Sequence, residues 1–355
     1  MWKVGLIGTG YWSEKHLNAW ARIENVEIAA LCNRTRGKLE QRAGQYSIPP
    51  DRLYTSVEEM LQRADIHIVD IVTGPETHLE LVTMAAKAGK HILCQKPFAL
   101  SLEEAYEMVR ITRDHNVRLM VTENWRWLQP FQIIKRAINA RSLGRIHSAR
   151  YAHSDYYTPR MMPDIPIPQP FFRSMPKLLF YEMGAHWFDT WRYLFGEPSR
   201  LYAETQTISP YIQGEDAGVV MLGYDSGFCG VLDASWATRR ESAGRVPGAI
   251  SANHKETLII EGEEATLKMD VSGKISLIDP DGQETVLAET TDLDHGASHY
   301  RLQKHFIECL DHELPFQTSG EDNLRTLELI FGTYESARNH QVKVLGDSIM
   351  GDSGR

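Results

Sequence analysis

Residues 3–13 read KVGLIGTGYWS and define the first structural motif of the chain. The apolar run Lys3–Ile7 is typical of a short buried strand, and it enters a turn that contains Gly8 and Gly10. A strand, a glycine-rich turn and a helix bind a dinucleotide pyrophosphate, because the glycines allow close backbone approach and the helix N-terminus offers N–H groups. Ser13 replaces the usual third glycine or alanine but is still small. We therefore expect five turn residues to contact a cofactor: Gly8, Thr9, Gly10, Tyr11 and Trp12.

The end of the second expected strand bears on the choice between NAD and NADP. Val26–Cys32 is followed by Asn33, 20 residues after Ser13, where an acidic residue would bind the ribose 2′-OH of NAD. Asparagine does not repel a 2′-phosphate, and Arg34 or Arg36 could pair with one. The alternative is that Arg34 stacks on the adenine or faces water. We expect Asn33 and Arg34 to contact NADP or NAD, and the pattern favours NADP.

Strand and helix patterns alternate through the first third of the chain. Ser56–Glu59 is typical of a helix start, whereas Ile66–Val72, His91–Cys94 and Val117–Val121 are typical of strands. This alternation predicts an α/β domain with a doubly wound parallel sheet, a Rossmann domain, over residues 1–122. Ligands bind beyond the carboxyl ends of such strands. The loops there supply further cofactor-binding candidates: Thr73, Gly74, Pro75, His78, Gln95 and Lys96.

The pattern changes after residue 122. Ile146–Tyr157 predicts a long strand, and residues 158–176 contain six prolines, which predicts an irregular loop that acts as a lid. Strand-like runs then continue to about residue 288. We expect a second α/β domain over residues 123–345, built on a large open, mostly antiparallel sheet, and a polar tail over 346–355. Two helices are expected to close this domain, Leu302–Leu310 and Leu324–Ala337.

The stretch Tyr181–Asp189, YEMGAHWFD, places a carboxylate and an imidazole four residues apart. On a helix Glu182 and His186 would point the same way, and such a pair can transfer protons near neutral pH. The plainer interpretation is a Glu and a His on the polar face of an amphipathic helix, and this stretch alone favours it. Lys96 also has two interpretations, a residue beside the nicotinamide site or an ordinary surface lysine.

The composition of the chain argues against several other classes of protein function. The 355-residue chain has a formal net charge of −9 and no run of Lys and Arg, which argues against a nucleic-acid partner. The four cysteines are scattered without a Cys-x-x-Cys pair, so neither a metal site nor a disulfide framework is expected. The first residues enter a strand at once and no apolar run reaches membrane length. We therefore expect no signal peptide, no membrane partner and a cytoplasmic location.

Three motifs taken together resemble the signature of the glucose-fructose oxidoreductase / inositol dehydrogenase / rhizopine catabolism (Gfo/Idh/MocA) family. They are Gly8–Ser13, Gln95–Pro97 and Glu182–Asp189. The family patterns are Gly-x-Gly-x-x-Gly/Ala, then Glu-Lys-Pro, then Asp-x-Gly-x-x-x-x-Asp with a His two residues after its Gly. The similarity covers nearly the whole chain in order. It implies a Rossmann domain followed by an α/β domain with a large open sheet.

The resemblance implies that Lys96 and His186 are the catalytic pair and that Glu182 occupies the assisting carboxylate position. In this interpretation His186 is the general base for oxidation, and Lys96 stabilises the developing charge on the substrate oxygen. The implied reaction moves a hydride between the nicotinamide cofactor and a hydroxyl or keto carbon of a sugar, polyol or glycoside. Three residues depart from the family pattern: Gln95 for Glu, Glu182 for Asp and Asn33 for an acidic residue.

A carbohydrate substrate needs a polar pocket, and ordinary packing is the alternative for each residue that we assign to it. An NAD-dependent glycosidase or lyase that oxidises its substrate transiently would share the fold, and a non-catalytic NADP-binding regulator is a further alternative. An open sheet with one covered face also predicts a homo-oligomer, a dimer or tetramer. The substrate-binding candidates are Lys96, Arg126, His153, Asp155, Tyr157, Glu182, His186 and Trp236.

Overall fold

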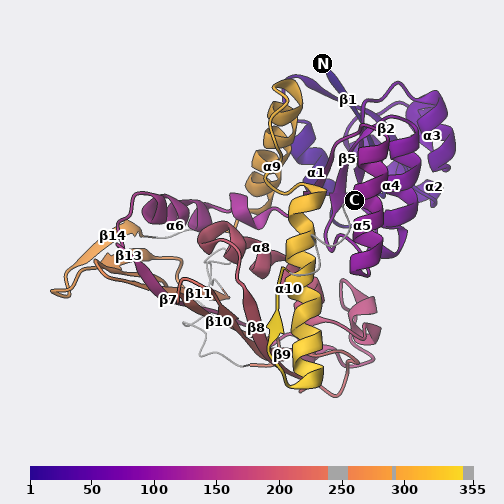
Figure 1. The fold of residues 1–355 in the computed structure, drawn as a ribbon. Coiled ribbons are helices and arrows are strands. Elements are labelled where there is room, and N and C mark those ends of the chain that lie inside the picture. Colours follow the sequence, from indigo (N-terminus) through magenta and orange to yellow (C-terminus); the bar gives the residue numbers. More distant parts are fainter. Residues whose placement is uncertain (239–254, 290–292, 347–355) are drawn as a thin grey trace, which may run out of the picture. The chain divides into compact units, whose positions relative to one another are not determined.

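The computed structural model describes residues 1–238, 255–289 and 293–346, and its backbone divides into two compact units (Figure 1). The first unit comprises residues 1–127 and 294–327, and the second comprises 128–293 and 328–355. Of the expected polar tail, all but Gly346 lies outside the described residues. The division by role, a cofactor domain over 1–122 and a substrate domain over 123–345, stays a prediction.

The first unit contains a six-stranded sheet in the order β3-β2-β1-β4-β5-β6. All of its strand pairs are parallel. The order reverses between β1 and β4, which is the switch point of a doubly wound fold, so this part of the predicted fold is confirmed. The strands are β1 Trp2–Ile7, β2 Val26–Cys32, β3 Leu53–Tyr54, β4 Ile68–Ile71, β5 His91–Gln95 and β6 Leu119–Thr122.

Helices cover the sheet because its strands are apolar on both sides. All four residues of β4 are buried, as a central parallel strand requires. Apolar side chains of α1 and α2 pack over β1 and β2, and α4 lies beside both α3 and α5 (Figure 1). The helices are α1 Ser13–Trp20, α2 Arg36–Gln45, α3 Val57–Arg63, α4 His78–Lys87 and α5 Leu102–Asp114, with short 3-10 turns η1 Pro50–Arg52, η2 Pro75–Thr77 and η3 Trp125–Trp127.

A helix from late in the chain, α9 (His295–Asp311), completes this unit. Its buried Leu302 and Phe306 pack with Trp20 of α1 and with side chains of the central strands. Residue 318 continues the sheet edge, because the N–H of Val121 donates to the Thr318 carbonyl at 2.8 Å. The helix expected at Leu302–Leu310 therefore starts earlier than predicted and packs in the first unit.

The second unit contains a nine-stranded sheet in the order β14-β13-β12-β11-β7-β10-β9-β8-β15. Among the described strands only β7 and β10 pair in parallel, so the prediction of a large, mostly antiparallel sheet is confirmed. The strands are β7 Ile146–Ser154, β8 Arg200–Gln206, β9 Ala217–Gly223, β10 Cys229–Ser235, β11 Glu256–Gly262, β12 Thr266–Met269, β13 Ile275–Ile278, β14 Glu284–Ala288 and β15 Lys343–Val344.

One face of this sheet packs closely on helices. A Cβ added to Gly230 of β10 would overlap the indole of Trp191, and one added to Gly218 of β9 would lie 2.7 Å from the Phe180 ring. Glycine at these two positions lets Trp191 of α8 and Phe180 of α7 pack directly on the strand backbone. Gly196, at φ +81°, ends α8 as predicted. The helices are α6 Gln129–Asn139, α7 Leu179–Glu182, α8 Gly184–Phe195 and α10 Gly320–Asn339, which begins in the first unit.

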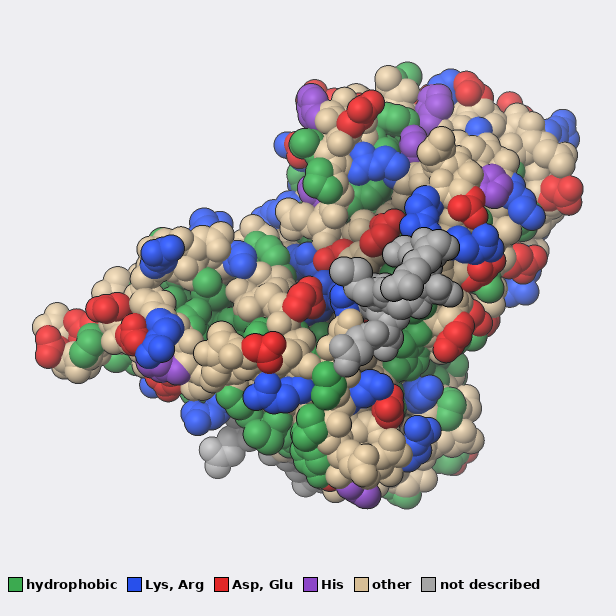
Figure 2. Space-filling model, in the orientation of Figure 1, with side chains coloured by type: hydrophobic (Ala, Val, Ile, Leu, Met, Phe, Trp, Pro, Cys, Tyr) green, Lys and Arg blue, Asp and Glu red, His purple; other side chains and the backbone are tan. Residues whose placement is uncertain are grey.

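Charged side chains are spread over the surface. On the face shown in Figure 2, Lys and Arg side chains are interspersed with Asp and Glu. That face offers no uniform basic area of the kind that follows a phosphate backbone. Among the described residues, no helix is both long enough and apolar enough to cross a membrane.

Candidate active site

The glycine-rich turn after β1 has the geometry that a dinucleotide needs. Gly8 has φ +97°, and a Cβ there would overlap the Val72 carbonyl and lie 2.9 Å from Cγ2 of Thr73. A Cβ on Gly10 would meet no atom within 4 Å, so the space beside this residue is open. The Thr9 hydroxyl is buried and has no hydrogen-bond partner among the described residues. Open space beside a backbone turn and an unsatisfied buried hydroxyl both fit a bound pyrophosphate.

Helix α1 follows this turn and directs its N-terminus towards it. Ser13, the first helical residue, is fully buried, and its hydroxyl donates to the Gly10 carbonyl at 2.6 Å. The preceding residue, Trp12, supplies no side-chain cap. The positive end of the helix is therefore available to an anion, and Ser13 performs the packing role of the usual glycine or alanine.

A hollow of about 320 Å³ opens beside this turn. Arg42 of α2 enters it, donating to the Gly10 carbonyl at 3.4 Å and pairing with Glu14 at 3.0 Å. Neither Arg42 nor Lys38 was predicted as a site residue, although their i, i+4 spacing could have indicated one basic face of a helix. The hollow is lined by Thr9, Gly10, Tyr11, Glu14, Lys38, Gln41, Arg42 and Gln45.

The residues proposed to select the cofactor follow β2 directly. Asn33 donates through its side chain to the Thr35 carbonyl at 3.1 Å, which orders the loop before α2. Arg34 is exposed, and Arg36 pairs with Glu40 on its own helix at 2.8 Å. Both arginines thus lie on the surface at the carboxyl end of β2, where the adenosine ribose is bound in this class of fold.

The loop after β4 is tied to the segment after β5 by His78. This histidine is fully buried, and its two ring nitrogens lie 3.0 Å from the Phe98 carbonyl and 3.2 Å from the Thr73 carbonyl. Burial lowers its pKa, although the two carbonyls and nearby carboxylates act in the opposite direction. Thr73, Gly74 and Pro75 lie at the carboxyl edge of the sheet, after β4, whereas the His78 ring is enclosed and holds two main-chain segments together.

Lys96 follows β5 at the same edge of the sheet. The preceding residue, Gln95, is 7% exposed, and its side chain turns inward. Its Oε1 accepts from the Lys96 N–H at 2.7 Å, and its Nε2 lies 3.1 Å from Nε2 of the buried His16. The polar interior around His16 was missed from the sequence, although Asp70 within an apolar strand was a signal of it.

In the second unit, Glu182 ends α7 and His186 lies in the first turn of α8. Met183 between them keeps αR backbone angles, and the N–H of His186 donates to the Met183 carbonyl at 3.0 Å, so the chain turns tightly from Glu182 to His186. His186 is 7% exposed, and Glu182 is half-buried.

Glu215 holds the start of α7, the short helix that precedes α8. Its carboxylate accepts from the main-chain N–H groups of Leu178 and Phe180, at 3.2 and 2.9 Å, and from the Tyr334 hydroxyl at 2.5 Å. Burial raises the pKa of Glu215, and these hydrogen bonds counteract part of the shift. The carboxylate therefore fixes the start of α7, which precedes Glu182 and His186.

Three substrate candidates gather where the parallel strands β7 and β10 end. Tyr157 donates its N–H to the Trp236 carbonyl at 2.7 Å, and their rings lie 5.4 Å apart. Asp155 pairs with Lys255 at 2.5 Å. The long strand expected at Ile146–Tyr157 ends at Ser154, because its last residues turn along this edge.

The proline-rich loop packs on this aromatic pair. Phe172 is 3% exposed, and its ring lies 5.6 Å from Trp236 and 6.4 Å from Tyr157. Arg173 donates to three main-chain carbonyls of the same loop, which gives it a defined shape despite its prolines. The loop contains two 3-10 turns, η4 Thr158–Arg160 and η5 Pro170–Ser174.

Two other substrate candidates already have protein partners. His153 is buried, and its Nδ1 lies 2.9 Å from the carboxylate of Glu256 on β11. Arg126, in the first unit, donates to the Gln317 carbonyl and pairs with Asp322 at 2.7 Å. These contacts give both residues a structural role.

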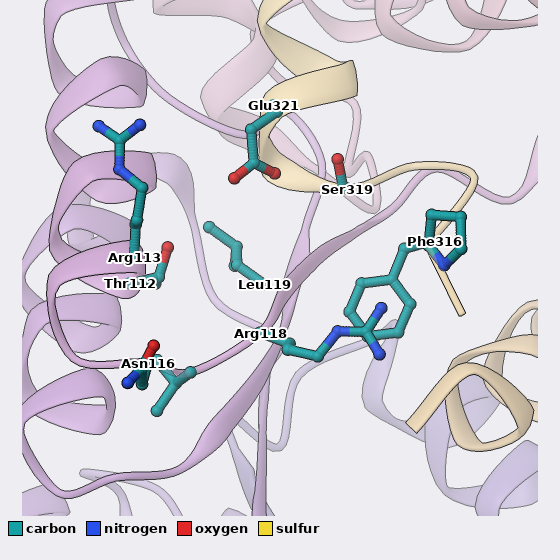
Figure 3. A pocket seen from close by; sticks show the side chains of 10 residues that line it. Thr112, Arg113, Asn116, Arg118, Leu119, Phe316, Ser319 and Glu321 are labelled. Atoms are coloured by element: carbon teal, nitrogen blue, oxygen red, sulfur yellow. The ribbon is translucent and has the colours of Figure 1, made fainter. Parts of the chain in front are cut away.

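A second hollow of about 390 Å³ lies between the end of α5 and residues 315–321 (Figure 3). The Arg118 guanidinium lies 3.9 Å from the ring centre of Phe316 and donates to the carbonyls of Cys309 and Leu314. Arg118 therefore joins β6 to the segment before α10. None of the predicted site residues lines this hollow, and no group of His, Cys, Asp and Glu among the described residues could hold a metal ion.

Comparison with known proteins agrees with this geometry. The model of the oxidoreductase family with an NAD-binding Rossmann fold matches residues 2–123, and that of the GFO/IDH/MocA C-terminal domain matches residues 131–268. A D-apiose dehydrogenase of Paraburkholderia graminis is 34% identical over 345 residues, which cover 95% of this chain and 88% of the relative. The chain belongs to the GFO/IDH/MocA oxidoreductase family.

Two further proteins similar to this chain support the assignment to the GFO/IDH/MocA family. A myo-inositol 2-dehydrogenase of Thermotoga maritima is 26% identical over 274 residues, 74% of this chain and 78% of the relative. The crystal structure of an oxidoreductase from Agrobacterium radiobacter, in complex with NAD+, L-tartaric acid and magnesium, is 28% identical. It superposes with a TM-score of 0.86 and covers 97% of this chain and 98% of its own. The expectation of an NAD-binding oxidoreductase of this family is confirmed.

Proposed function

We propose that this oxidoreductase transfers a hydride between NAD(P) and a hydroxyl or keto carbon of a sugar, polyol or glycoside. The observation that carries the proposal is the position of Lys96. It follows β5 at the sheet edge that also bears the Gly8–Gly10 turn after β1 and Thr73 after β4. A dinucleotide bound at the switch point of such a sheet lies along this edge. The sugar class rests on relatives such as the D-apiose dehydrogenase.

The first unit supplies the cofactor site in this proposal. The turn Gly8–Trp12 and the α1 N-terminus would hold the pyrophosphate, and Thr73–Pro75, Gln95 and Lys96 would line the nicotinamide half. When bound, the nicotinamide accepts or supplies the hydride. We place the enzyme in the cytoplasm, where a pool of NAD(P) is available.

The catalytic groups are Lys96, His186 and Glu182. His186 takes the proton from the substrate hydroxyl during oxidation and returns it during reduction. The Lys96 ammonium donates a hydrogen bond to the same oxygen and stabilises its developing charge. Glu182, one turn from His186, orients the imidazole.

Kinetics of two alanine variants test this assignment. His186→Ala and Lys96→Ala should each lower kcat by about two to four orders of magnitude. The Kd for NADH, measured by fluorescence titration, should stay within about threefold, since the Gly8–Gly10 turn is intact. Retention of wild-type turnover by either variant would contradict the catalytic roles.

We further propose that the enzyme uses NADP, or both cofactors. Asn33 carries no charge that would exclude a 2′-phosphate, and the exposed Arg34 and Arg36 stand next to it. Titration with each cofactor measures the preference. A Kd for NAD at least tenfold lower than that for NADP, about 1.4 kcal/mol, would refute it.

The substrate pocket that we propose uses the edge formed by Asp155, Tyr157 and Trp236. Aromatic rings and a carboxylate suit the apolar faces and hydroxyls of a sugar. His153 and Arg126 remain candidates from the sequence, although their contacts within the protein make them weaker ones. A panel of sugars, polyols and glycosides with both cofactors identifies the substrate by reduction of NAD(P). Glycoside cleavage without net reduction would instead indicate a glycosidase or lyase.

We also propose that the chain forms a homo-oligomer, a dimer or tetramer, through the open face of the second sheet. Met221 is 48% exposed and Val219 41%, and the register places Met221 beside Val231 and Tyr202 on that face. An apolar stripe of this kind is typical of an interface. Light scattering at micromolar concentration should show an oligomer that Met221→Lys dissociates, whereas Ile208→Lys, on an exposed loop, should not. A monomeric wild type would refute the proposal.

A further inference from the structure

A continuous line of hydrogen bonds runs through the interior of the first unit to the main chain of Lys96. It begins at Asp70 of β4, whose carboxylate lies 2.9 Å from Nδ1 of His16 and accepts from the indole of Trp20 at 2.7 Å. Nε2 of His16 lies 3.1 Å from Nε2 of Gln95, and Oε1 of Gln95 accepts from the Lys96 N–H at 2.7 Å. Asp70 and His16 are fully buried.

The donors and acceptors along this line admit a single arrangement. The Lys96 N–H can only donate, so the Gln95 oxygen faces it and the Gln95 amide nitrogen faces His16. That nitrogen can only donate, so Nε2 of His16 must accept. The imidazole proton is then on Nδ1, where the Asp70 carboxylate accepts it. His16 is therefore neutral in this arrangement, and each of these hydrogen bonds pairs one donor with one acceptor.

We propose that Gln95 is a positioning residue for Lys96 and that its amide, in place of a carboxylate, keeps His16 in this neutral tautomer. The proposal rests on the proposed catalytic role of Lys96. Gln95 differs from the Glu of the family pattern at this position, and its buried side chain holds the main chain of Lys96. A small displacement of a catalytic group is sufficient to slow turnover strongly.

A carboxylate at position 95 would change the protonation of His16. With Asp70 on one side and the introduced carboxylate on the other, both ring nitrogens would have to donate, so the ring would take up a proton. The His299 ring of α9 lies 5.0 Å from the His16 ring, and the Trp20 indole of α1 donates to the Asp70 carboxylate. Cys94 of β5, also buried, lies near Asp70. When His299 and Cys94 are neutral, none of these neighbouring groups carries a positive charge. The imidazolium of His16 would then be the positive charge that pairs with the two carboxylates.

Nitrogen-15 NMR of the histidine rings in the whole protein tests the tautomer directly. In the wild type at neutral pH, His16 should show a protonated Nδ1 and an unprotonated Nε2. In Gln95→Glu both nitrogens should be protonated, whereas Gln62→Glu, which makes the same change on the exposed face of α3, should leave His16 as in the wild type. A protonated Nε2 in the wild type would overturn the proposal without any variant.

Kinetics test the positioning role. Gln95→Leu should lower kcat about 10- to 100-fold, with the Kd for NADH within about threefold of the wild type. Gln95→Glu should lower kcat less than Gln95→Leu does, because a carboxylate oxygen can still accept from the Lys96 N–H. An unchanged kcat in Gln95→Leu would overturn the proposal. A variant in which only the Kd for NADH rises would also overturn it, and would indicate that Gln95 contacts the cofactor directly. Full activity in Lys96→Ala would instead refute the catalytic role of Lys96 and leave the NMR result intact.

Discussion

Replacing Gly10 by alanine should weaken cofactor binding while leaving the folded protein intact, whereas the same change at Gly8 should damage both. The difference follows from the space around each residue. A Cβ on Gly10 meets no atom within 4 Å, and its backbone does not have a positive φ. A Cβ on Gly8 overlaps the Val72 carbonyl, and its φ of +97° disfavours any residue with a side chain.

These contacts set the expected magnitudes. For Gly8→Ala, the backbone conformation costs about 1–2 kcal/mol and the overlap about 1–3 kcal/mol, so the free energy of unfolding should fall by about 2–5 kcal/mol. For Gly10→Ala it should change by less than about 0.5 kcal/mol. The added methyl group would instead occupy the space through which the backbone approaches the pyrophosphate. The Kd for NADH should therefore rise about tenfold or more, a loss of about 1.4 kcal/mol.

Two measurements on each variant separate the effects. Urea unfolding without cofactor gives the stability, and fluorescence titration with NADH gives the Kd. If Gly10→Ala bound NADH as tightly as the wild type, the open space beside Gly10 would not be the pyrophosphate site. If Gly10→Ala unfolded as easily as Gly8→Ala, the distinction drawn from the structure would be wrong.

Three further predictions concern stability and reactivity. Because burial lowers the pKa of His78 below its ordinary 6.5, the wild type should lose stability as the pH falls from about 7.5 to 5.5, by at most about 1.4 kcal/mol per pH unit. His78→Gln should lose less in the same urea titrations, and an equal loss would contradict this. Glu215→Gln should destabilise the protein by about 1–3 kcal/mol, because two main-chain N–H groups lose their carboxylate acceptor. An unchanged Tm would refute the role of Glu215 in holding the start of α7. A thiol reagent should modify only the exposed Cys229 in the native protein and all four cysteines in denaturant, since the other three are buried and burial raises the pKa of Cys32 to about 11. Rapid modification of a second cysteine in the native protein would contradict this.

The sequence by itself determined the parts of the fold that depend on neighbouring residues. Glycines between an apolar strand and a helical pattern are typical of a pyrophosphate-binding turn, so Gly8 and Gly10 identified the nucleotide-binding half. The change from alternating strands and helices to consecutive strands identified the second sheet, and Gly196 marked the end of α8. These signals are local, because backbone sterics and periodicity act over a few residues.

Only the tertiary structure decided which distant side chains meet. The apolar stripe of α9 could have packed on either sheet, and it joined the first unit because Leu302 and Phe306 fill the space beside Trp20. His153 faces Glu256 because the register between β7 and β11 places them opposite each other, 103 residues apart in sequence. Gln95 at the end of β5 likewise reaches His16, 79 residues away, because α1 begins at the carboxyl edge of the parallel sheet, where β5 ends. Burial and hydrogen-bond partners of this kind depend on strand order and register, which the local pattern of residues does not contain.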